Sequence, residues 1–210
     1  IEHVANRTFV FILVLTFYVF AVRAGLRANL IPLFGQEAGG LSESAIGFIL
    51  SASAFSNFAV LWHAGSLIDR RGRMWVAMPS LVATGAISAA FAISPAFWSL
   101  LVMSVFFGAA LGYLAPAPAA MAADLTPREL MGSMMGIYRM GGDLGLLLGP
   151  VGVGFVAERL GFEAAYIAAG LFALVVLGLG VGLPETLGGR RRAEPAIEAA
   201  ARIDASDAGR

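Results

Sequence analysis

The chain has 210 residues, of which 59% are hydrophobic and 13% are charged, and its mean hydropathy is +0.81. A soluble domain is about half apolar and a quarter charged, so this composition excludes that class and predicts an integral membrane protein. The formal net charge of zero gives no general attraction to nucleic acid, and the absence of cysteine excludes disulfide and thiolate metal chemistry.

Six apolar stretches are long enough to cross a bilayer as helices, because one span needs about 20 mostly apolar residues. Hydropathy places these helices at residues 8–31, 43–68, 74–94, 96–123, 129–157 and 162–184. We therefore expect an all-α membrane protein with one six-helix domain over residues 1–187. Residues 188–210 are polar and rich in Ala, which predicts a disordered tail. The chain begins without a signal peptide, and we expect a further segment upstream.

Arginines gather on one side of the expected bundle. The turn after the second helix holds Arg70, Arg71 and Arg73, the turn after the fourth helix holds Arg128, and residues 190–192 are all Arg. Turns on the other side carry few or no arginines. Since positively charged loops stay in the cytoplasm, this bias predicts a plasma-membrane protein with both ends of the chain cytoplasmic.

The first helix carries two arginines, Arg23 and Arg27, one turn apart in its outer part. Two guanidinium groups at this spacing suit a carboxylate or phosphate, so we consider them candidate substrate ligands. Two alternatives remain open. The side chains can snorkel to the outer membrane surface, or they can pair with Glu37 beyond the helix.

The second and fourth helices each carry a polar residue within an apolar stretch. Asn57 and Tyr113 are candidate groups lining a substrate cavity. His63 is a candidate proton relay, although a histidine one turn before a helix end also suits the membrane interface.

A short pattern occurs twice in the chain. The second helix ends in Gly65, Asp69, Arg70 and Gly72, and the fifth helix ends in the matching set Gly154, Glu158, Arg159 and Gly161. Both copies read G-x-x-x-[DE]-R-x-G. Because the copies are three helices apart, they lie on opposite sides of the membrane. This spacing predicts two three-helix units in an inverted repeat, as in many transporters.

Three further charges, Asp124, Arg139 and Asp143, belong to the fourth and fifth helices. An isolated charge at the centre of a bilayer is costly, so we expect Arg139 and Asp143 to pair with each other or with Asp69, Arg73 and Asp124. We consider these residues a charge network. It is either a static network near the inner surface or a gate that breaks and reforms.

The turn containing Gly65, Asp69, Arg70, Gly72 and Arg73 resembles the signature loop of the major facilitator superfamily. The stretch beginning "AADLTPREL" and the closing "LPETL" resemble other parts of the same fold. Members have two six-helix halves, so the resemblance implies that this chain is one half, and the polar tail favours the C-terminal half. The missing N-terminal half would then be its partner, and the signature loop would act in gating.

This resemblance implies secondary active transport of a small solute by alternating access, driven by protons or by a counter-substrate. The chain contains no Lys and therefore no nucleotide-binding loop of the usual kind, and it has no pair of histidines at metal-ligand spacing. We expect no enzymatic activity, no metal and no cofactor. The alternative function is a membrane scaffold or regulatory bundle without transport. Charges inside the membrane favour transport, because a scaffold gains nothing from them.

Overall fold

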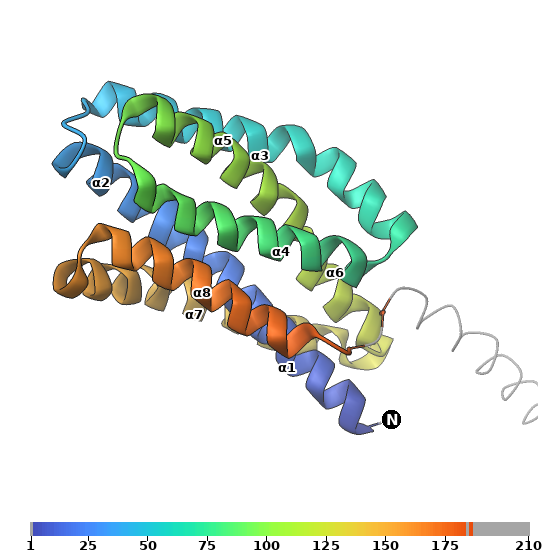
Figure 1. Cartoon of the computed structure of the whole chain (residues 1–210). Coiled ribbons are helices and arrows are strands. Elements are labelled where there is room, and N and C mark those ends of the chain that lie inside the picture. The colour runs from blue at the N-terminus through green and yellow to red at the C-terminus, as the bar shows by residue number, and fades with distance from the viewer. Residues whose placement is uncertain (1, 184, 187–210) are drawn as a thin grey trace, which may run out of the picture.

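The computed structural model describes residues 2–183 and 185–186, and the predicted tail at 188–210 lies outside them. The described residues form helices and turns (Figure 1). The helices are α1 (Glu2–Val22), η1 (Arg23–Leu30), α2 (Ile31–Glu37), α3 (Glu43–Arg71), α4 (Arg73–Ala90), η2 (Phe91–Ile93), α5 (Phe97–Leu114), α6 (Pro116–Leu125), η3 (Arg128–Leu130), α7 (Met131–Leu160) and α8 (Phe162–Gly180).

Six of the helical segments are long and apolar enough to cross a membrane, as predicted. They cover Arg7–Glu37, Glu43–Arg71, Arg73–Ile93, Phe97–Leu125, Met131–Leu160 and Phe162–Gly180. All six run along one axis, so the bundle has two ends (Figure 1). We call them the Arg73 end, where α3 meets α4, and the Phe34 end, where α7 meets α8.

The first span is longer than the sequence indicated. It continues through Pro32 to Glu37, because Pro32 occupies the start of α2, where a missing backbone N–H costs nothing. Its central segment, η1, is a π-helix of eight residues. The side chain of Asn29 donates a hydrogen bond of 2.6 Å to the carbonyl of Ala24 within this segment. Such wide turns are rare in proteins and often mark functional sites.

The helix pairings confirm the predicted inverted repeat. The most extensive contacts join the second span to the fourth, the fifth to the first, and the third to the sixth. The repeat makes the first, second and third spans equivalent to the fourth, fifth and sixth. The pairing of the second span with the fourth is then equivalent to that of the fifth span with the first, and the pairing of the third span with the sixth is equivalent to itself. The two three-helix units therefore use equivalent packing surfaces, and the packing follows the repeat that Gly65–Gly72 and Gly154–Gly161 indicate.

Small residues allow the paired helices to approach closely. A Cβ atom at Gly149 would lie 2.6 Å from the backbone of Ala21, which shows how tightly α7 packs against α1. The equivalent pairing brings Gly112 of α5 against Asn57 of α3, where a Cβ would lie 2.8 Å from a carbonyl oxygen. Close backbone approach through glycine is a common means of holding helices together in lipid.

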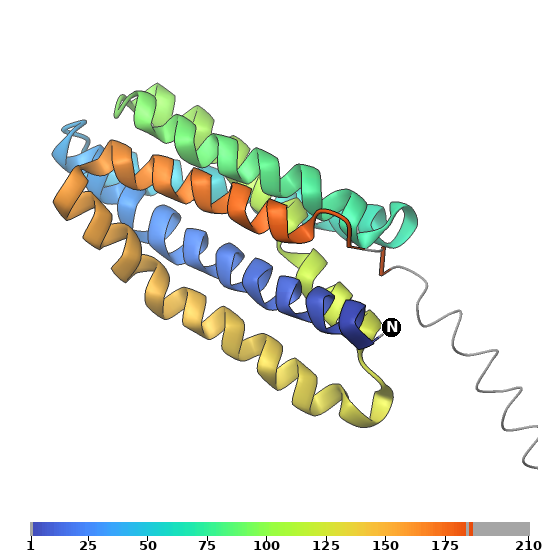
Figure 2. The same cartoon turned by 60° about the horizontal axis from the view of Figure 1, so that its bottom comes forward.

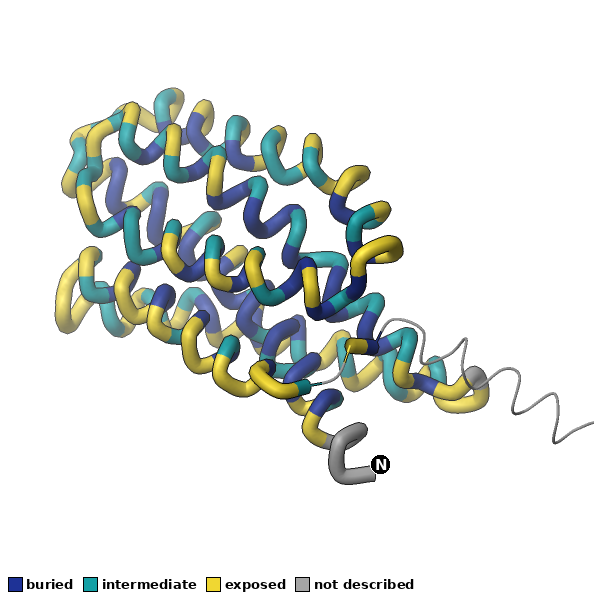
Figure 3. The backbone as a smooth tube through the Cα atoms, turned by 45° about the vertical axis from the view of Figure 1, so that its right-hand side comes forward, coloured by how far each residue is buried: buried dark blue, intermediate teal, exposed yellow. Residues whose placement is uncertain are grey.

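Burial is unequal among the spans. We compare the share of buried residues in the most apolar 18-residue stretch of each span. This share is 56% in the first span and 50% in the fourth, but only 17% in the second and in the fifth. The buried residues gather in the interior of the bundle (Figure 3). The second and fifth spans, α3 and α7, therefore expose most of their surface, and α7 lies at one edge of the bundle (Figure 2).

Candidate functional site

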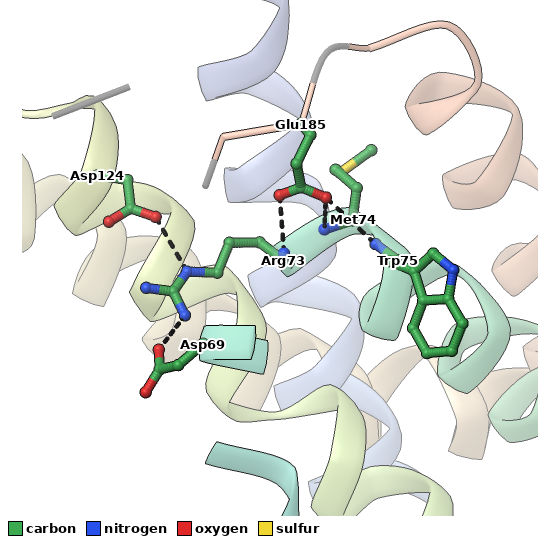
Figure 4. A network of polar contacts seen from close by, with 6 residues as sticks. All are labelled: Asp69, Arg73, Met74, Trp75, Asp124 and Glu185. Carbon is green, nitrogen blue, oxygen red and sulfur yellow. Dashed lines mark hydrogen bonds and ion pairs between the residues drawn. The ribbon is translucent and has the colours of Figure 1, made fainter. Parts of the chain in front are cut away.

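The turn between α3 and α4 brings together charged side chains from three helices (Figure 4). Gly72 ends α3 with a φ of +121°, a conformation that residues with a Cβ rarely adopt. Its N–H donates to the carbonyl of Ile68, and Arg73 then begins α4 at once. A single residue thus separates the two helices, and this short turn fixes the position of Arg73.

Arg73 connects α4 to two carboxylates. Its Nε donates a hydrogen bond of 2.9 Å to Oδ2 of Asp124 at the end of α6, and another guanidinium nitrogen pairs with Asp69 of α3. The Arg73 side chain is only 12% exposed, and that of Asp124 is 19% exposed, whereas Asp69 is 69% exposed. The pair with Asp124 is therefore better shielded from water and the stronger of the two.

Glu185 binds the same turn from the far end of the chain. Its Oε1 accepts a hydrogen bond of 2.7 Å from the backbone N–H of Arg73, and its Oε2 accepts one of 3.0 Å from Met74 and a longer one from Trp75. These N–H groups have no partner within the helix, and the helix dipole favours a negative charge there. Sequence reasoning did not identify this role, because 112 residues separate Glu185 from Arg73.

The second copy of the pattern has the same backbone but different contacts. Gly161 ends α7 with a φ of +90°, and its N–H donates to the carbonyl of Ala157. Arg159 lies over the ring of Phe155 at 5.1 Å, much as Arg71 lies over Trp75 at 4.8 Å. The next residue is Phe162 rather than an arginine, and no ion pair forms here among the described residues.

Arg139 and Asp143 do not join the network around Arg73, contrary to our expectation. Both side chains are exposed, and neither forms an ion pair with any residue that the structure describes. The reason is the orientation of α7, which turns Gly142, Gly145 and Gly149 toward α1 and leaves the face with the charges uncovered. A charge at the centre of a bilayer costs roughly 2.5–3.5 kcal/mol on insertion scales, so this face requires a polar environment.

The arginines of the first span lie on η1, with Arg23 exposed and Arg27 partly buried. In the described part of the chain neither forms an ion pair, so the alternative pairing with Glu37 is absent. Glu37 is ten residues beyond Arg27, or about 15 Å along a helix, which is too far for contact. The anion-binding and snorkelling interpretations both stay predictions.

The polar residues of α3 contribute to helix packing. The side-chain amide of Asn57 donates a hydrogen bond of 3.0 Å to the carbonyl of Gly108, and Ser56 donates one of 2.8 Å to Val105. His63 Nδ1 and the Tyr113 hydroxyl lie 2.9 Å apart. These contacts join α3 to α5. They occupy some of the donor and acceptor groups of these side chains, which are then not available to bind a solute. No group of three or more His, Cys, Asp or Glu side chains that could hold a metal ion occurs among the residues that the structure describes.

Comparison with known proteins identifies relatives of this arrangement. The family model of the Major Facilitator Superfamily matches residues 11–204. The multidrug resistance protein MdtG of Escherichia coli strain 55989 is 29% identical over 142 residues, which are 65% of this chain and 34% of that protein. MdtG of Escherichia fergusonii is 27% identical over 140 residues, with the same coverage of both chains.

Solved structures share the fold. The crystal structure of the peptide transporter POT in complex with sulfate matches with a TM-score of 0.75 at 20% identity, over 95% of this chain and 45% of that one. The human organic anion transporter MFSD10 matches with a TM-score of 0.63 at 23% identity, over 89% of this chain and 48% of that one. This chain thus spans about a third of the curated relatives and under half of the solved ones. Since the family model covers most of its length, the chain belongs to the Major Facilitator Superfamily of membrane transporters.

Proposed function

We propose that the protein moves a small solute across the membrane by alternating access, as a secondary active transporter driven by protons or by a counter-substrate. The observation that carries the proposal is the contact of Arg73 with both Asp69 and Asp124, which joins α3, α4 and α6 at one end of the bundle. Asp124 and Asp69 lie on spans separate from that of Arg73. Movement of these spans apart must therefore break the contacts.

The contacts of Arg73 act as a latch on the Arg73 end. When they are formed, this end is closed and the transporter opens toward the Phe34 end. Opening of the Arg73 end exposes Arg73 and Asp124 to water, which replaces their mutual hydrogen bond. A substitution at this latch shifts the equilibrium between the closed and open states of the Arg73 end only if it changes the free energies of the two states by different amounts. We therefore assign one set of residues to gating rather than to solute binding, namely Gly65, Asp69, Arg70, Gly72 and Arg73.

A second six-helix bundle of the same protein completes the transport pathway, with this chain as the C-terminal half. Two observations support this proposal. The chain spans 34% of the MdtG sequences and 45% of the POT structure. In addition, α3 and α7 are the least buried spans, and α7 exposes charged side chains that lipid does not accommodate. A partner bundle would cover both helices and provide the opposite wall of a cavity.

The protein lies in the plasma membrane, and its Arg73 end faces the cytoplasm because this end has the excess of arginines. These 210 residues contain no cysteine, so a single cysteine introduced among them is a specific probe in this chain. A cysteine in place of Gly188 should react with a membrane-impermeant maleimide only in inverted vesicles, and one in place of Gly40 only in intact cells. Labelling of Gly188→Cys from outside would contradict the orientation.

Transport is tested with the intact protein reconstituted in vesicles and three probes, namely ethidium, dialanine and fluorescein, which represent organic cations, peptides and organic anions. We expect flux of at least one probe that exceeds the flux in protein-free vesicles, and slower flux after Arg73→Asp. Flux that is absent for all three probes, with normal folding, would contradict transport and favour the alternative function of a membrane scaffold.

Arg23 and Arg27 are the candidate ligands for an acidic group of the solute, with Asn57 and Tyr113 as further candidates for the cavity. Two guanidinium groups on a π-helix, neither of them ion-paired with a described residue, can bind one carboxylate between them. Replacement of both arginines by Gln should weaken fluorescein binding while membrane insertion and thermal stability stay unchanged. Equal affinity in the double variant would support snorkelling to the membrane surface instead.

A further inference from the structure

Asp143 of α7 is a carboxylate near the middle of the membrane without a partner in the described part of the chain. Its neighbours Gly141 and Leu144 line a groove together with Phe172 of α8. Phe172 lies ten residues from one end of α8 and eight from the other, or about 12–15 Å from either end of a membrane-spanning helix. Asp143 is therefore too deep for its short side chain to reach either membrane surface.

The three sides of α7 have different environments. One side, with Gly142, Gly145 and Gly149, packs against α1. A second side, with Ile137, Met140 and Leu144, lines the apolar groove next to α8. Asp143 belongs to the third side, four residues after Arg139 and seven before Pro150, so these residues form one stripe along the helix. Only this stripe carries charge in the membrane-embedded part of α7.

The stripe leads to a pocket at the Phe34 end that is mostly apolar but contains three polar side chains. Pro150 and Ala157 follow Asp143 at intervals of seven residues, and both line a pocket of about 240 Å³. Asn29, Glu37 and Glu158 line the same pocket. A pocket with two carboxylates and an amide at the end of the bundle, and a carboxylate near the middle of the membrane, thus lie along one side of α7.

We propose that the Asp143 carboxylate binds the coupling proton, which it receives from the Phe34 end through this pocket. Binding converts the carboxylate to a neutral carboxylic acid, and release toward the Arg73 end regenerates the carboxylate. The neutral form tolerates an apolar environment, whereas the ionised form requires water or a cation. Protonation therefore permits the closure of α7 against an apolar surface during alternation. This inference rests on the proposed transport function and adds the residue that couples it to protons.

Other ionisable groups near α7 do not occupy this position. Arg139 lies one turn away on the same helix but forms no ion pair with Asp143. Among the side chains that the structure describes, the ionisable ones on the elements packed against α7 are Arg7 and Tyr18 of α1, Arg23 and Arg27 of η1, Asp124 of α6, Glu129 of η3, and Glu163 and Tyr166 of α8. None of these side chains forms an ion pair or a hydrogen bond with Asp143 in the described structure.

Infrared difference spectra of the intact protein in lipid, recorded between acidic and alkaline buffer, test the proposal with the proton itself as the probe. We expect a protonated-carboxyl band that disappears in Asp143→Asn, shifts in Asp143→Glu, and persists in the matched control Glu163→Gln. Glu163 is also exposed, but it lies at the start of α8 near the membrane surface. Identical difference spectra for the native protein and Asp143→Asn would overturn the proposal.

A transport measurement separates this proposal from the proposed function itself. With ethidium as the probe, a gradient of about one pH unit should drive about tenfold accumulation if one proton exchanges for one solute. Asp143→Asn should lose this accumulation but retain exchange of ethidium without a gradient. Gradient-driven accumulation that survives in Asp143→Asn would contradict the role of Asp143. Loss of exchange in the native protein itself would instead contradict transport of this probe.

Discussion

The two ends of the bundle are held together by different kinds of contact. At the Arg73 end, one arginine and three carboxylates connect α3, α4 and α6 to the segment after α8. At the Phe34 end, Phe34 packs against Phe162 and Tyr166, with ring centroids 5.4 and 5.3 Å apart, and Tyr166 stacks on Phe91. Both ends contain the same helix-ending pattern with a glycine of positive φ.

This difference shows how one repeated pattern serves two purposes. The pattern ends a membrane helix and reverses the chain in both copies. A latch forms only where an arginine follows the glycine and where a carboxylate from a neighbouring span can reach it. When an ion pair breaks, water can replace the lost contacts of both charged groups, whereas separating a buried aromatic cluster exposes a large apolar area. Within this bundle, contacts that break and reform are therefore expected at the Arg73 end, where the proposed latch lies.

Among the changes that test the difference between the two ends, charge reversal at Arg73 should have the largest effect on the transport rate. Arg73→Asp places three carboxylates together and removes a charge-assisted bond, a contribution of about 1.5–3 kcal/mol or roughly ten- to a hundredfold in an equilibrium. We expect the transport rate at matched expression to fall by about this factor. Adding Asp124→Arg should restore part of the rate, and the control Arg159→Asp at the other end should have little effect. A double-mutant cycle without coupling between positions 73 and 124 would exclude the latch.

Replacement of the two helix-ending glycines should compare the ends directly. Alanine at either position adopts an unfavourable φ, which costs about 1–3 kcal/mol. At Gly72 the new Cβ would also lie 2.5 Å from the Glu185 carboxylate, whereas at Gly161 nothing lies within 4 Å. Gly72→Ala should therefore lower the thermal unfolding temperature in detergent more than Gly161→Ala does. Equal shifts for the two variants would argue that Glu185 contributes nothing at this turn.

Removal of the Glu185 charge should have an intermediate effect. Glu185→Gln keeps an oxygen acceptor but loses the favourable interaction with the start of α4, a contribution of about 0.3–1 kcal/mol for a charge near a helix end. We expect a small decrease in thermal stability and in transport rate. Glu158→Gln, the matched change at the Phe34 end, should leave thermal stability unchanged. If both variants have the same stability, the contact with α4 is not stabilising.

Asp69→Asn should have the smallest effect. The Asp69 side chain is 69% exposed, so its ion pair with Arg73 is largely screened by water, and such pairs contribute about 0.2–1 kcal/mol. We expect a slower turnover with nearly unchanged affinity for solute, because Asp69 stabilises one state and does not contact the solute. Initial rates over a range of ethidium concentrations provide this measurement. A change confined to affinity would place Asp69 in the binding site instead.

Much of the architecture followed from the sequence. Long apolar stretches can satisfy their backbone hydrogen bonds in lipid only as helices, so composition alone indicated the six spans. The repeated pattern around Gly72 and Gly161 indicated the inverted repeat, because each unit must end its second helix in the same way. The first span extends beyond the predicted residue 31, because Pro32 is compatible with the start of α2 and does not end the helix there.

Which charges meet was decided only by the tertiary structure. The sequence does not distinguish three charged residues near or within membrane helices, namely Asp124, Arg139 and Asp143. The rotation of α7, determined by the packing of Gly145 and Gly149 against α1, places Arg139 and Asp143 on an exposed side. Glu185 reaches α4 because the sixth span returns the chain to the Arg73 end. A local pattern determines where a helix ends, but contacts between distant residues depend on how all six helices rotate and pack.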